Sequence, residues 1–188
     1  MDTLPISLAD SPPDLRQSHV ILVGLPGAGK STVGNLLSRK LGVAFLDFDV
    51  EIVRREGLAI TEIFARRGEW AFRALERALT EEVAGMQGRM VLAPGGGWVT
   101  QPDAVALLRP RSLLVYLRIS PGGALRRMGR RISTRPLLQN ADPRGELERL
   151  LDSRRGVYET ADVVVDVEHM EPQRVADAIE RRLAPDPS

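Results

Sequence analysis

The sequence contains no cysteine, which excludes disulfide bonds and thiolate metal sites. It also lacks an excess of charge, because 26 basic and 25 acidic side chains leave a net charge of +1. A nearly neutral chain gives no reason to expect nucleic acid or a membrane surface as a partner. No apolar run approaches the length that crosses a bilayer. The N-terminal segment has no basic stretch followed by an apolar one, so we expect no secretory signal and a cytoplasmic protein.

Lysine is nearly absent as well. Of the 26 basic side chains, only Lys30 and Lys40 are lysines. Lysine is a compact point charge on a flexible stem, whereas arginine is a planar fork. Because the chain uses arginine almost everywhere else, the lysine in the glycine-rich stretch GLPGAGKST indicates that position 30 requires the compact charge.

Short apolar runs alternate with segments of helical periodicity along the chain. The expected strands are residues 19–23, 43–46, 90–93, 113–117 and 163–167. The expected helices are residues 30–41, 50–55, 60–66, 70–86, 102–108, 146–158 and 172–183. Because the strands are continuous apolar runs, we expect a parallel sheet covered by helices on both faces. The sequence therefore predicts one α/β domain over residues 19–184, with loose tails at 1–18 and 185–188.

A phosphate-binding loop is predicted between the first strand and the first helix, where Gly24 to Ser31 fit the pattern G-x-x-x-x-G-K-[ST]. The glycines let backbone N–H groups turn toward phosphate oxygens, and the following helix adds the positive end of its dipole. Lys30 should reach the β- and γ-phosphates, and the Ser31 hydroxyl should bind Mg²⁺. The position of this loop after an apolar strand and before a helix favours a phosphate-binding loop over a chance glycine-rich turn. The candidate ATP-binding residues of this loop are Gly27, Ala28, Gly29, Lys30, Ser31 and Thr32.

Two carboxylates follow the second predicted strand. Asp47 and Asp49 stand two residues apart, so on a strand end their side chains would point the same way. Ligands bind at the carboxyl edge of α/β sheets. One carboxylate can serve the Mg²⁺ shell through water, and the other can accept a hydroxyl proton. The alternative is a solvated turn in which an aspartate caps the next helix.

The stretch GEWAFRALE, residues 68–76, places Arg73 three positions before Glu76 on a predicted helix. Glu76 could hold the Arg73 guanidinium so that it faces a substrate carboxylate. From spacing alone, however, an ordinary surface ion pair of little energetic consequence is the better interpretation.

Three glycines, Gly95, Gly96 and Gly97, directly follow the strand predicted at residues 90–93. Without side chains they let a ligand approach the backbone closely and expose N–H donors. Because they follow a strand end, we favour a binding loop over a plain flexible connection.

An arginine-rich and weakly periodic segment fills residues 118–145. A nucleic-acid-binding patch is one interpretation, but the segment lacks interleaved aromatic residues and the chain is nearly neutral, and both facts argue against it. A mobile lid at about residues 126–142 that closes over a triphosphate fits better, with one arginine stabilising the transferred phosphoryl group. The arginines of this segment that we single out are Arg126, Arg127, Arg130, Arg131 and Arg135.

In their order, the stretches GLPGAGKST, DFD, GEWAFRALE, PGGG and RPLL, with an arginine shortly before YETAD, resemble the shikimate kinase family. The resemblance covers about residues 19–183. It implies a three-layer P-loop fold of the nucleoside monophosphate kinase type, with a five-stranded parallel sheet. It also implies ATP-dependent phosphorylation of the 3-hydroxyl of shikimate, on the pathway to aromatic amino acids, with Mg²⁺ as cofactor.

On the ATP side, the resemblance assigns roles by position in this sequence. Asp47 matches the aspartate that is linked to Mg²⁺ through water, together with Ser31. Arg135 matches the lid arginine that reaches the ATP phosphates, so Lys30 and Arg135 are the candidate catalytic cations. Arg127 matches the arginine under the adenine.

On the acceptor side, Asp49 matches the aspartate that holds the accepting hydroxyl and is the candidate base. Arg73 and Arg154 match the two arginines that bind the substrate carboxylate. The remaining matched residues are Gly95, Gly96 and Gly97 at the ring hydroxyls, and Phe64 and Phe72 as apolar walls.

The sequence departs from the family pattern at three places. Gly156 replaces a proline near the second carboxylate-binding arginine, so Arg155 competes with Arg154 for that assignment. Trp98 stands where a small residue is common and is expected at the edge of the pocket. The loop at residues 166–172 lacks the arginine that the family often places against the adenine.

Two other functions stay open. A kinase for another small hydroxy acid, such as gluconate, would also bind a carboxylate, but the combination of DFD, FR and GGG argues against it. A non-catalytic ligand-sensing domain on this fold would normally lose catalytic residues or carry a DNA-binding module, for which the N-terminal segment is too short. Instead Lys30, Ser31, Asp47, Asp49 and Arg73 are all present. No interface signature is visible, so we expect a monomer.

Overall fold

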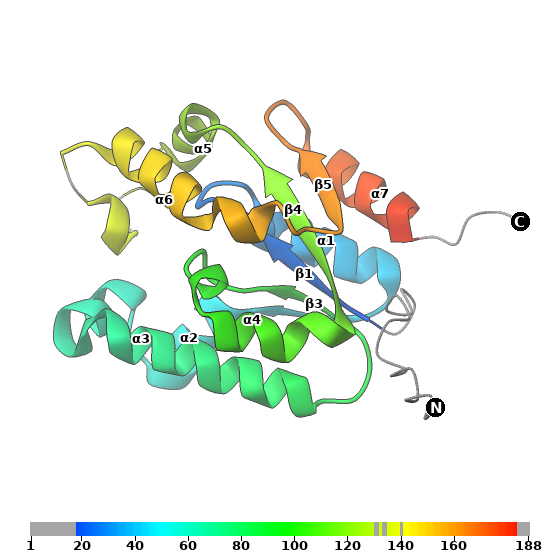
Figure 1. The fold of residues 1–188 in the computed structure, drawn as a ribbon, viewed down its shortest axis with the longest axis horizontal. Helices are drawn as coiled ribbons and strands as arrows, with labels where there is room; N and C mark the ends of the chain where they lie inside the picture. Colours follow the sequence, from blue (N-terminus) through cyan, green and yellow to red (C-terminus); the bar gives the residue numbers. More distant parts are fainter. Residues whose placement is uncertain (1–17, 130–131, 133–134, 140, 184–188) are drawn as a thin grey trace, which may run out of the picture.

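Five parallel strands form one sheet in the order β2-β3-β1-β4-β5 (Figure 1). The computed structural model describes residues 18–129, 132, 135–139 and 141–183. The strands are β1 (His19–Val23), β2 (Ala44–Asp47), β3 (Met90–Ala93), β4 (Ser112–Arg118) and β5 (Val163–Asp166). Because the strands are parallel, their carboxyl ends meet at one edge of the sheet.

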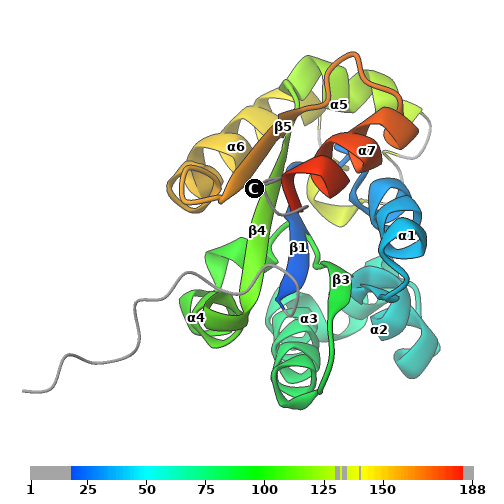
Figure 2. The ribbon, with the colours of Figure 1, turned by 90° about the vertical axis from the view of Figure 1, so that its right-hand side faces the viewer.

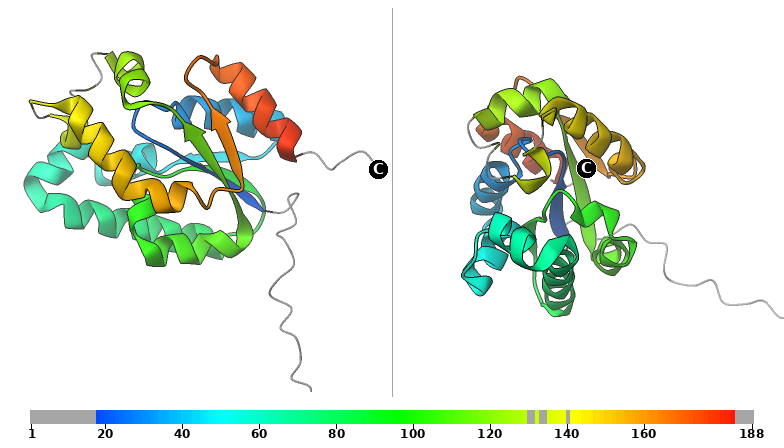
Figure 3. Two further views of the ribbon diagram at one scale, coloured as in Figure 1. Left: turned by 45° about the horizontal axis from the view of Figure 1, so that its top comes forward. Right: turned by 90° about the vertical axis from the view of Figure 1, so that its left-hand side faces the viewer.

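Helices cover both faces of this sheet, as the predicted apolar strands require (Figures 1 and 2). On one face α1 packs against α7, and on the other α3 packs against α4. Helix α5 contacts α6, and Figure 3 shows the pair from two further sides. The helices are α1 (Lys30–Leu41), α2 (Phe48–Glu56), α3 (Ile60–Gly85), α4 (Pro102–Leu108), α5 (Pro121–Met128), α6 (Pro143–Tyr158) and α7 (Pro172–Leu183). Short 3₁₀ turns are η1 (Trp98–Thr100), η2 (Arg109–Arg111) and η4 (Pro136–Leu138).

Strand β1 is buried on both of its faces. Val20 and Leu22 belong to the core cluster under α1 and α7, whereas Ile21 and Val23 belong to the cluster under α3 and α4. This alternation confirms that a continuous apolar run here indicates a central strand of a three-layer α/β fold.

Helix α5 lies in the segment that the sequence analysis left without a regular element, and that expectation is wrong. Ser120 accepts a hydrogen bond from the Gly123 backbone, and Pro121 occupies the first turn. Ala124 and Met128 are the buried residues that hold the helix on the core. The two glycines and two arginines of this short helix conceal its periodicity.

The helices predicted at residues 60–66 and 70–86 form one element, α3, with a break at Gly68, whose φ of 79° and ψ of 169° are not helical. Strand β2 ends at Asp47, and α2 begins directly afterwards at Phe48. None of the helices in the described ranges is long and apolar enough to cross a membrane. The predicted tails lie outside the described residues except for Ser18, and so do Arg130 and Arg131.

Candidate active site

Two adjoining cavities lie at the carboxyl edge of the sheet. The P-loop cavity has a volume of about 420 Å³ and is lined by residues that include Gly27, Gly29, Lys30, Ser31, Thr32, Asp47 and Arg127. The arginine cavity is smaller, about 60 Å³, and is lined by residues that include Phe64, Phe72, Arg73, Gly95, Gly96, Gly97 and Arg154. Both cavities share Pro26, Asp49, Gly96 and Arg135. The structure thus brings together almost all of the predicted site residues, and places Asp49 between the two cavities.

Lys30 lies in the first turn of α1, where its Nζ donates to the Gly24 carbonyl at 2.9 Å and to the Leu25 carbonyl at 3.4 Å. Burial, followed by the charge of the nearby Arg135, lowers the pKa of Lys30 to about 8. An ammonium whose charge is disfavoured by its surroundings is stabilised when an anionic ligand arrives. Lys30 is therefore in place to bind phosphate oxygens.

The loop before Lys30 depends on glycine for its shape. Gly27 and Gly29 have φ angles of 86° and 95°, which other residues rarely adopt. The Ala28 backbone N–H donates to the Leu25 carbonyl at 3.1 Å, which closes the turn. The predicted phosphate-binding geometry of this loop is consistent with these conformations.

Ser31 and Asp47 form a pair on the floor of the P-loop cavity. The Ser31 hydroxyl donates to Asp47 Oδ2, and the Val50 backbone N–H donates to Asp47 Oδ1 at 3.2 Å. Asp47 therefore caps α2 and also lines the P-loop cavity. The two alternatives weighed for this carboxylate, a helix cap and a site residue, are compatible. The reason given for Asp49 is wrong, because Asp49 lies in the first turn of α2 and not on a strand. Both carboxylates still line the P-loop cavity.

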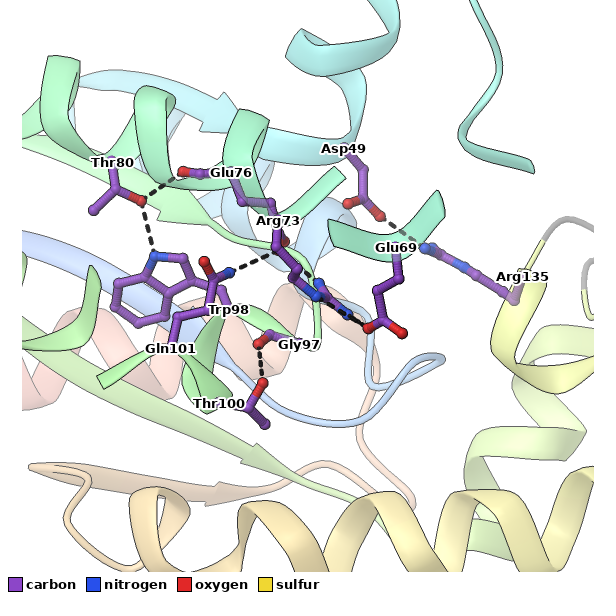
Figure 4. Close-up of polar contacts among 10 residues, drawn as sticks. All are labelled: Asp49, Glu69, Arg73, Glu76, Thr80, Gly97, Trp98, Thr100, Gln101 and Arg135. Atoms are coloured by element: carbon purple, nitrogen blue, oxygen red, sulfur yellow. Dashed lines mark hydrogen bonds and ion pairs between the residues drawn. The ribbon is translucent and has the colours of Figure 1, made fainter. Parts of the chain in front are cut away.

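Arg135 lies against Asp49, with Nη1 donating to Asp49 Oδ2 at 2.8 Å (Figure 4). The predicted lid arginine therefore contacts the predicted base. Both side chains line both cavities, so Arg135 also has access to the P-loop side.

Arg73 forms an ion pair with the buried Glu76, so the expectation of an ordinary surface ion pair is wrong. Glu76 is 0% exposed, and its Oε2 accepts from Arg73 Nη1 at 2.6 Å (Figure 4). The same guanidinium donates to Glu69 at 2.7 Å through Nη2. Burial raises the pKa of Glu76 to about 7, although Arg73 opposes the shift. Two carboxylates thus fix the Arg73 guanidinium beside the arginine cavity.

Arg154 is the second arginine of the cavity, and Arg155 is not. Arg154 on α6 is 3% exposed, and its Nε and Nη1 have no hydrogen-bond partner among the described residues. Arg155 is exposed and donates to Asp152 at 2.7 Å. Because buried N–H donors are costly to leave unpaired, Arg154 favours an anionic ligand in the cavity. A Cβ on Gly156 would meet nothing within 4 Å, so the packing around this position does not require glycine.

The three glycines after β3 make room for charged side chains of the protein itself. A Cβ on Gly95 would overlap Glu76 Oε1 and lie 3.0 Å from Asp49 Oδ1, and one on Gly97 would overlap the Arg73 guanidinium. The run therefore serves close packing of the site's charges, a role that the sequence analysis did not anticipate.

Phe64 and Phe72 form an apolar wall of the arginine cavity, as predicted from the resemblance. Their ring centroids are 5.2 Å apart, and the Arg73 guanidinium lies 5.5 Å from the Phe72 centroid. The expectation for Trp98 is wrong. This side chain is 1% exposed, lies in the core and donates from Nε1 to Thr80 Oγ1 at 2.9 Å, away from the lining of both cavities.

Arg127 on α5 connects the P-loop with the loop after β5. Its guanidinium donates to the carbonyls of Ala28 at 3.4 Å, of Met170 at 3.1 Å, and of Val167. Sequence reasoning missed the other apolar lining of this side, which includes Met128, Met170 and Pro172. Only the position of α5 reveals them, because nothing in the local pattern marks them.

Comparison with known proteins places these features in one family. A family model described as shikimate kinase matches residues 26–184. The shikimate kinase of Halorhodospira halophila (strain DSM 244 / SL1) is 44% identical over 172 residues, which cover 91% of this chain and 96% of the relative. The solved shikimate kinase from Acinetobacter baumannii, in complex with shikimate, is 36% identical with a TM-score of 0.83, over 89% of this chain and 93% of that one. A gluconokinase from Sinorhizobium meliloti, at 24% identity over 89% and 94% of the two chains and a TM-score of 0.56, shares the fold alone.

The buried Glu76 carboxyl should make stability depend on pH. Its folded-state pKa of about 7 lies above the ordinary 4.5, so the native state binds this proton more tightly than the unfolded state. The stability from this group is present below pH 4.5 and is lost as pH rises through 7. Relative to Glu76→Gln, the wild-type free energy of unfolding should fall by roughly 2–3 kcal/mol between about pH 5 and pH 8. Urea unfolding at both pH values measures this, and parallel curves for the two proteins would contradict it.

Proposed function

Because the chain belongs to the shikimate kinase family, we propose that this site transfers the γ-phosphoryl group of ATP to the 3-hydroxyl of shikimate. The chain is a kinase that phosphorylates shikimate, as its family and relatives support. The observation that carries the assignment of the site is the buried Arg154, whose unpaired donors face a small cavity that adjoins a P-loop. Such a cavity suits a small carboxylate with hydroxyl groups.

At the acid end, Arg73 and Arg154 bind the substrate carboxylate. Arg73 is held by Glu76 at 2.6 Å and by Glu69 at 2.7 Å, so its guanidinium is positioned before the substrate arrives. Positioned donors lose less freedom on binding and discriminate better between acids. The aromatic wall of Phe64 and Phe72 packs against the apolar face of the ring.

At the hydroxyl end, Asp49 accepts the proton of the 3-hydroxyl while that oxygen attacks the γ-phosphorus. The bond from this phosphorus to the bridging oxygen of ADP breaks, and ADP leaves with the electron pair. Lys30 lies on the P-loop side of the reaction and stabilises charge on the phosphate oxygens. Arg135 exchanges its Asp49 contact for the transferred phosphoryl group, which frees the carboxylate to accept the proton.

Ser31 and Asp47 are the residues that would hold Mg²⁺, Asp47 through water. Their oxygens pair with each other on the floor of the P-loop cavity, and hydroxyl, carboxylate and water oxygens are the ligands this hard cation prefers. When bound, the ion supplies positive charge to the phosphate oxygens. Arg127 remains the candidate for the adenine side, since it lies between the P-loop and the loop after β5.

Closure of the predicted lid over the bound substrates is part of this proposal, because water would otherwise accept the phosphoryl group. Residues 130, 131, 133, 134 and 140 of that predicted segment lie outside the described residues. A cytoplasmic location and a monomeric state stay predictions from the sequence. The two alternative functions are a kinase for gluconate and a non-catalytic sensor. The assay below separates both from a shikimate kinase.

A coupled assay of ADP release tests the proposed function. With Mg²⁺ and ATP, shikimate should support turnover, and quinate and gluconate should support far less. Omission of Mg²⁺ should abolish turnover. The absence of shikimate-dependent ADP release would contradict the proposal, and a preference for gluconate would favour the other kinase.

Replacement of the proposed base should separate binding from chemistry. Asp49→Asn should lower kcat by about 10³-fold, because the amide cannot accept the hydroxyl proton. ATP binding, measured by calorimetry, should stay near that of the wild type, since the P-loop is intact. Turnover near that of the wild type would remove Asp49 from the mechanism.

The neighbouring arginines of α6 offer a matched pair. Arg154→Ala should raise KM for shikimate by about 10- to 100-fold, because it removes charged donors to the carboxylate. KM for ATP should change much less. Arg155→Ala, which removes an exposed side chain paired with Asp152, should leave both values unchanged. Equal effects of the two substitutions would contradict the assignment of Arg154.

A further inference from the structure

The Glu76 carboxylate has a second donor that lines neither cavity. Gln101 follows η1 and stands at the N-cap of α4. Its Nε2 donates to Glu76 Oε2 at 3.0 Å, the same oxygen that accepts from Arg73 at 2.6 Å (Figure 4). Gln101 therefore does not contact the proposed substrate site directly, and its side chain reaches that site through Glu76.

The backbone around Gln101 is fixed at both ends. Its N–H donates to the Trp98 carbonyl and its carbonyl accepts from the Val105 N–H, each at 3.0 Å. Trp98 Nε1 donates to Thr80 Oγ1, which in turn donates to the Glu76 carbonyl at 2.8 Å. One short segment thus holds the backbone of Glu76 through Trp98 and its carboxylate through Gln101, so the amide of Gln101 has little freedom to leave.

The charge state of Glu76 depends on a balance of neighbours. Arg73 on α3 and Arg154 on α6 favour the ionised carboxylate, whereas burial and Asp49 on α2 oppose it, so that the pKa of Glu76 lies at about 7. Oε1 has no hydrogen-bond partner among the described residues and lies with Asp49 Oδ1 beside Gly95. Where the two protonation states are so nearly balanced, one neutral donor to the carboxylate shifts the equilibrium measurably.

We propose that Gln101 is a positioning residue for the kinase reaction: its amide keeps Glu76 ionised and thereby holds Arg73 in the orientation that binds the substrate carboxylate. This inference rests on the proposed function, because it concerns the affinity for shikimate. A protonated Glu76 loses its ionic attraction for Arg73, and Glu69 is then the one carboxylate among the described residues that holds the guanidinium, so its orientation toward the cavity is less well fixed. Affinity for shikimate should therefore fall at low pH, and Gln101 should set the pH at which this acid limb of the profile lies.

Two substitutions with opposite expected effects test this proposal. Gln101→Met keeps the length of the side chain and removes the donor, so the acid limb of kcat/KM for shikimate should move to higher pH by about 0.5–1 unit. At pH near 7, KM for shikimate should rise about three- to tenfold with little change in kcat at high pH. Gln101→Lys offers a charged donor on a slightly longer side chain and should move the acid limb to lower pH. A role limited to packing would not shift the limb in opposite directions.

Matched controls separate the outcomes. Gln173→Met and Gln173→Lys remove another glutamine that faces a carboxylate, that of Asp177 at 3.4 Å on α7, and should leave the shikimate pH profile unchanged. In a Glu76→Gln background, Gln101→Met should no longer move the pH profile of kcat/KM for shikimate. This double variant keeps the test decisive if Gln101→Lys does not fold. An active wild type whose profile stays fixed in Gln101→Met, or moves in the same direction in both variants, would overturn the inference. Absence of shikimate turnover in the wild type would instead contradict the proposed function.

Discussion

The ion pair between Arg73 and the buried Glu76 is the interaction on which the proposed acceptor site depends. A carboxylate that is 0% exposed requires partners, and it finds them in a guanidinium at 2.6 Å and an amide at 3.0 Å. Glycine at position 95 leaves room for the Glu76 carboxylate, and glycine at position 97 leaves room for the Arg73 guanidinium. The pair thus explains the glycine run and the position of Arg73 together.

The two cavities divide the chemistry by charge. Lys30 on the P-loop side is partly buried, and Arg154 on the acid side is buried with two nitrogens that have no partner among the described residues. Each of these cations suits one end of the proposed transfer. Asp49 lies between them and is paired with Arg135 at 2.8 Å. The charges of the protein thus suit phosphate on one side and carboxylate on the other, and in the proposed reaction the Arg135 contact is the one that changes.

Much of the fold and part of the site could be predicted from the sequence, for local reasons. The strands were found because central parallel strands are apolar on both faces, and the P-loop because its parts lie within eight residues. Helix α5 was missed because glycine and arginine conceal its periodicity. Asp49 was placed correctly for the wrong reason, since the helix that begins at Phe48, not strand alternation, directs it to the cavity. Trp98 was misplaced because nothing local shows that it is buried.

By itself, the sequence determined the type of fold, the phosphate loop and the family resemblance, since each is written in contiguous residues or their periodicity. Only the tertiary structure decided that Glu76 is buried, that Arg154 rather than Arg155 faces the cavity, and that Gln101 reaches Glu76. These facts depend on burial and on contacts between segments far apart in the chain. The effective strength of a charge is set by the water and the partners around it, and spacing along the chain contains no information on either.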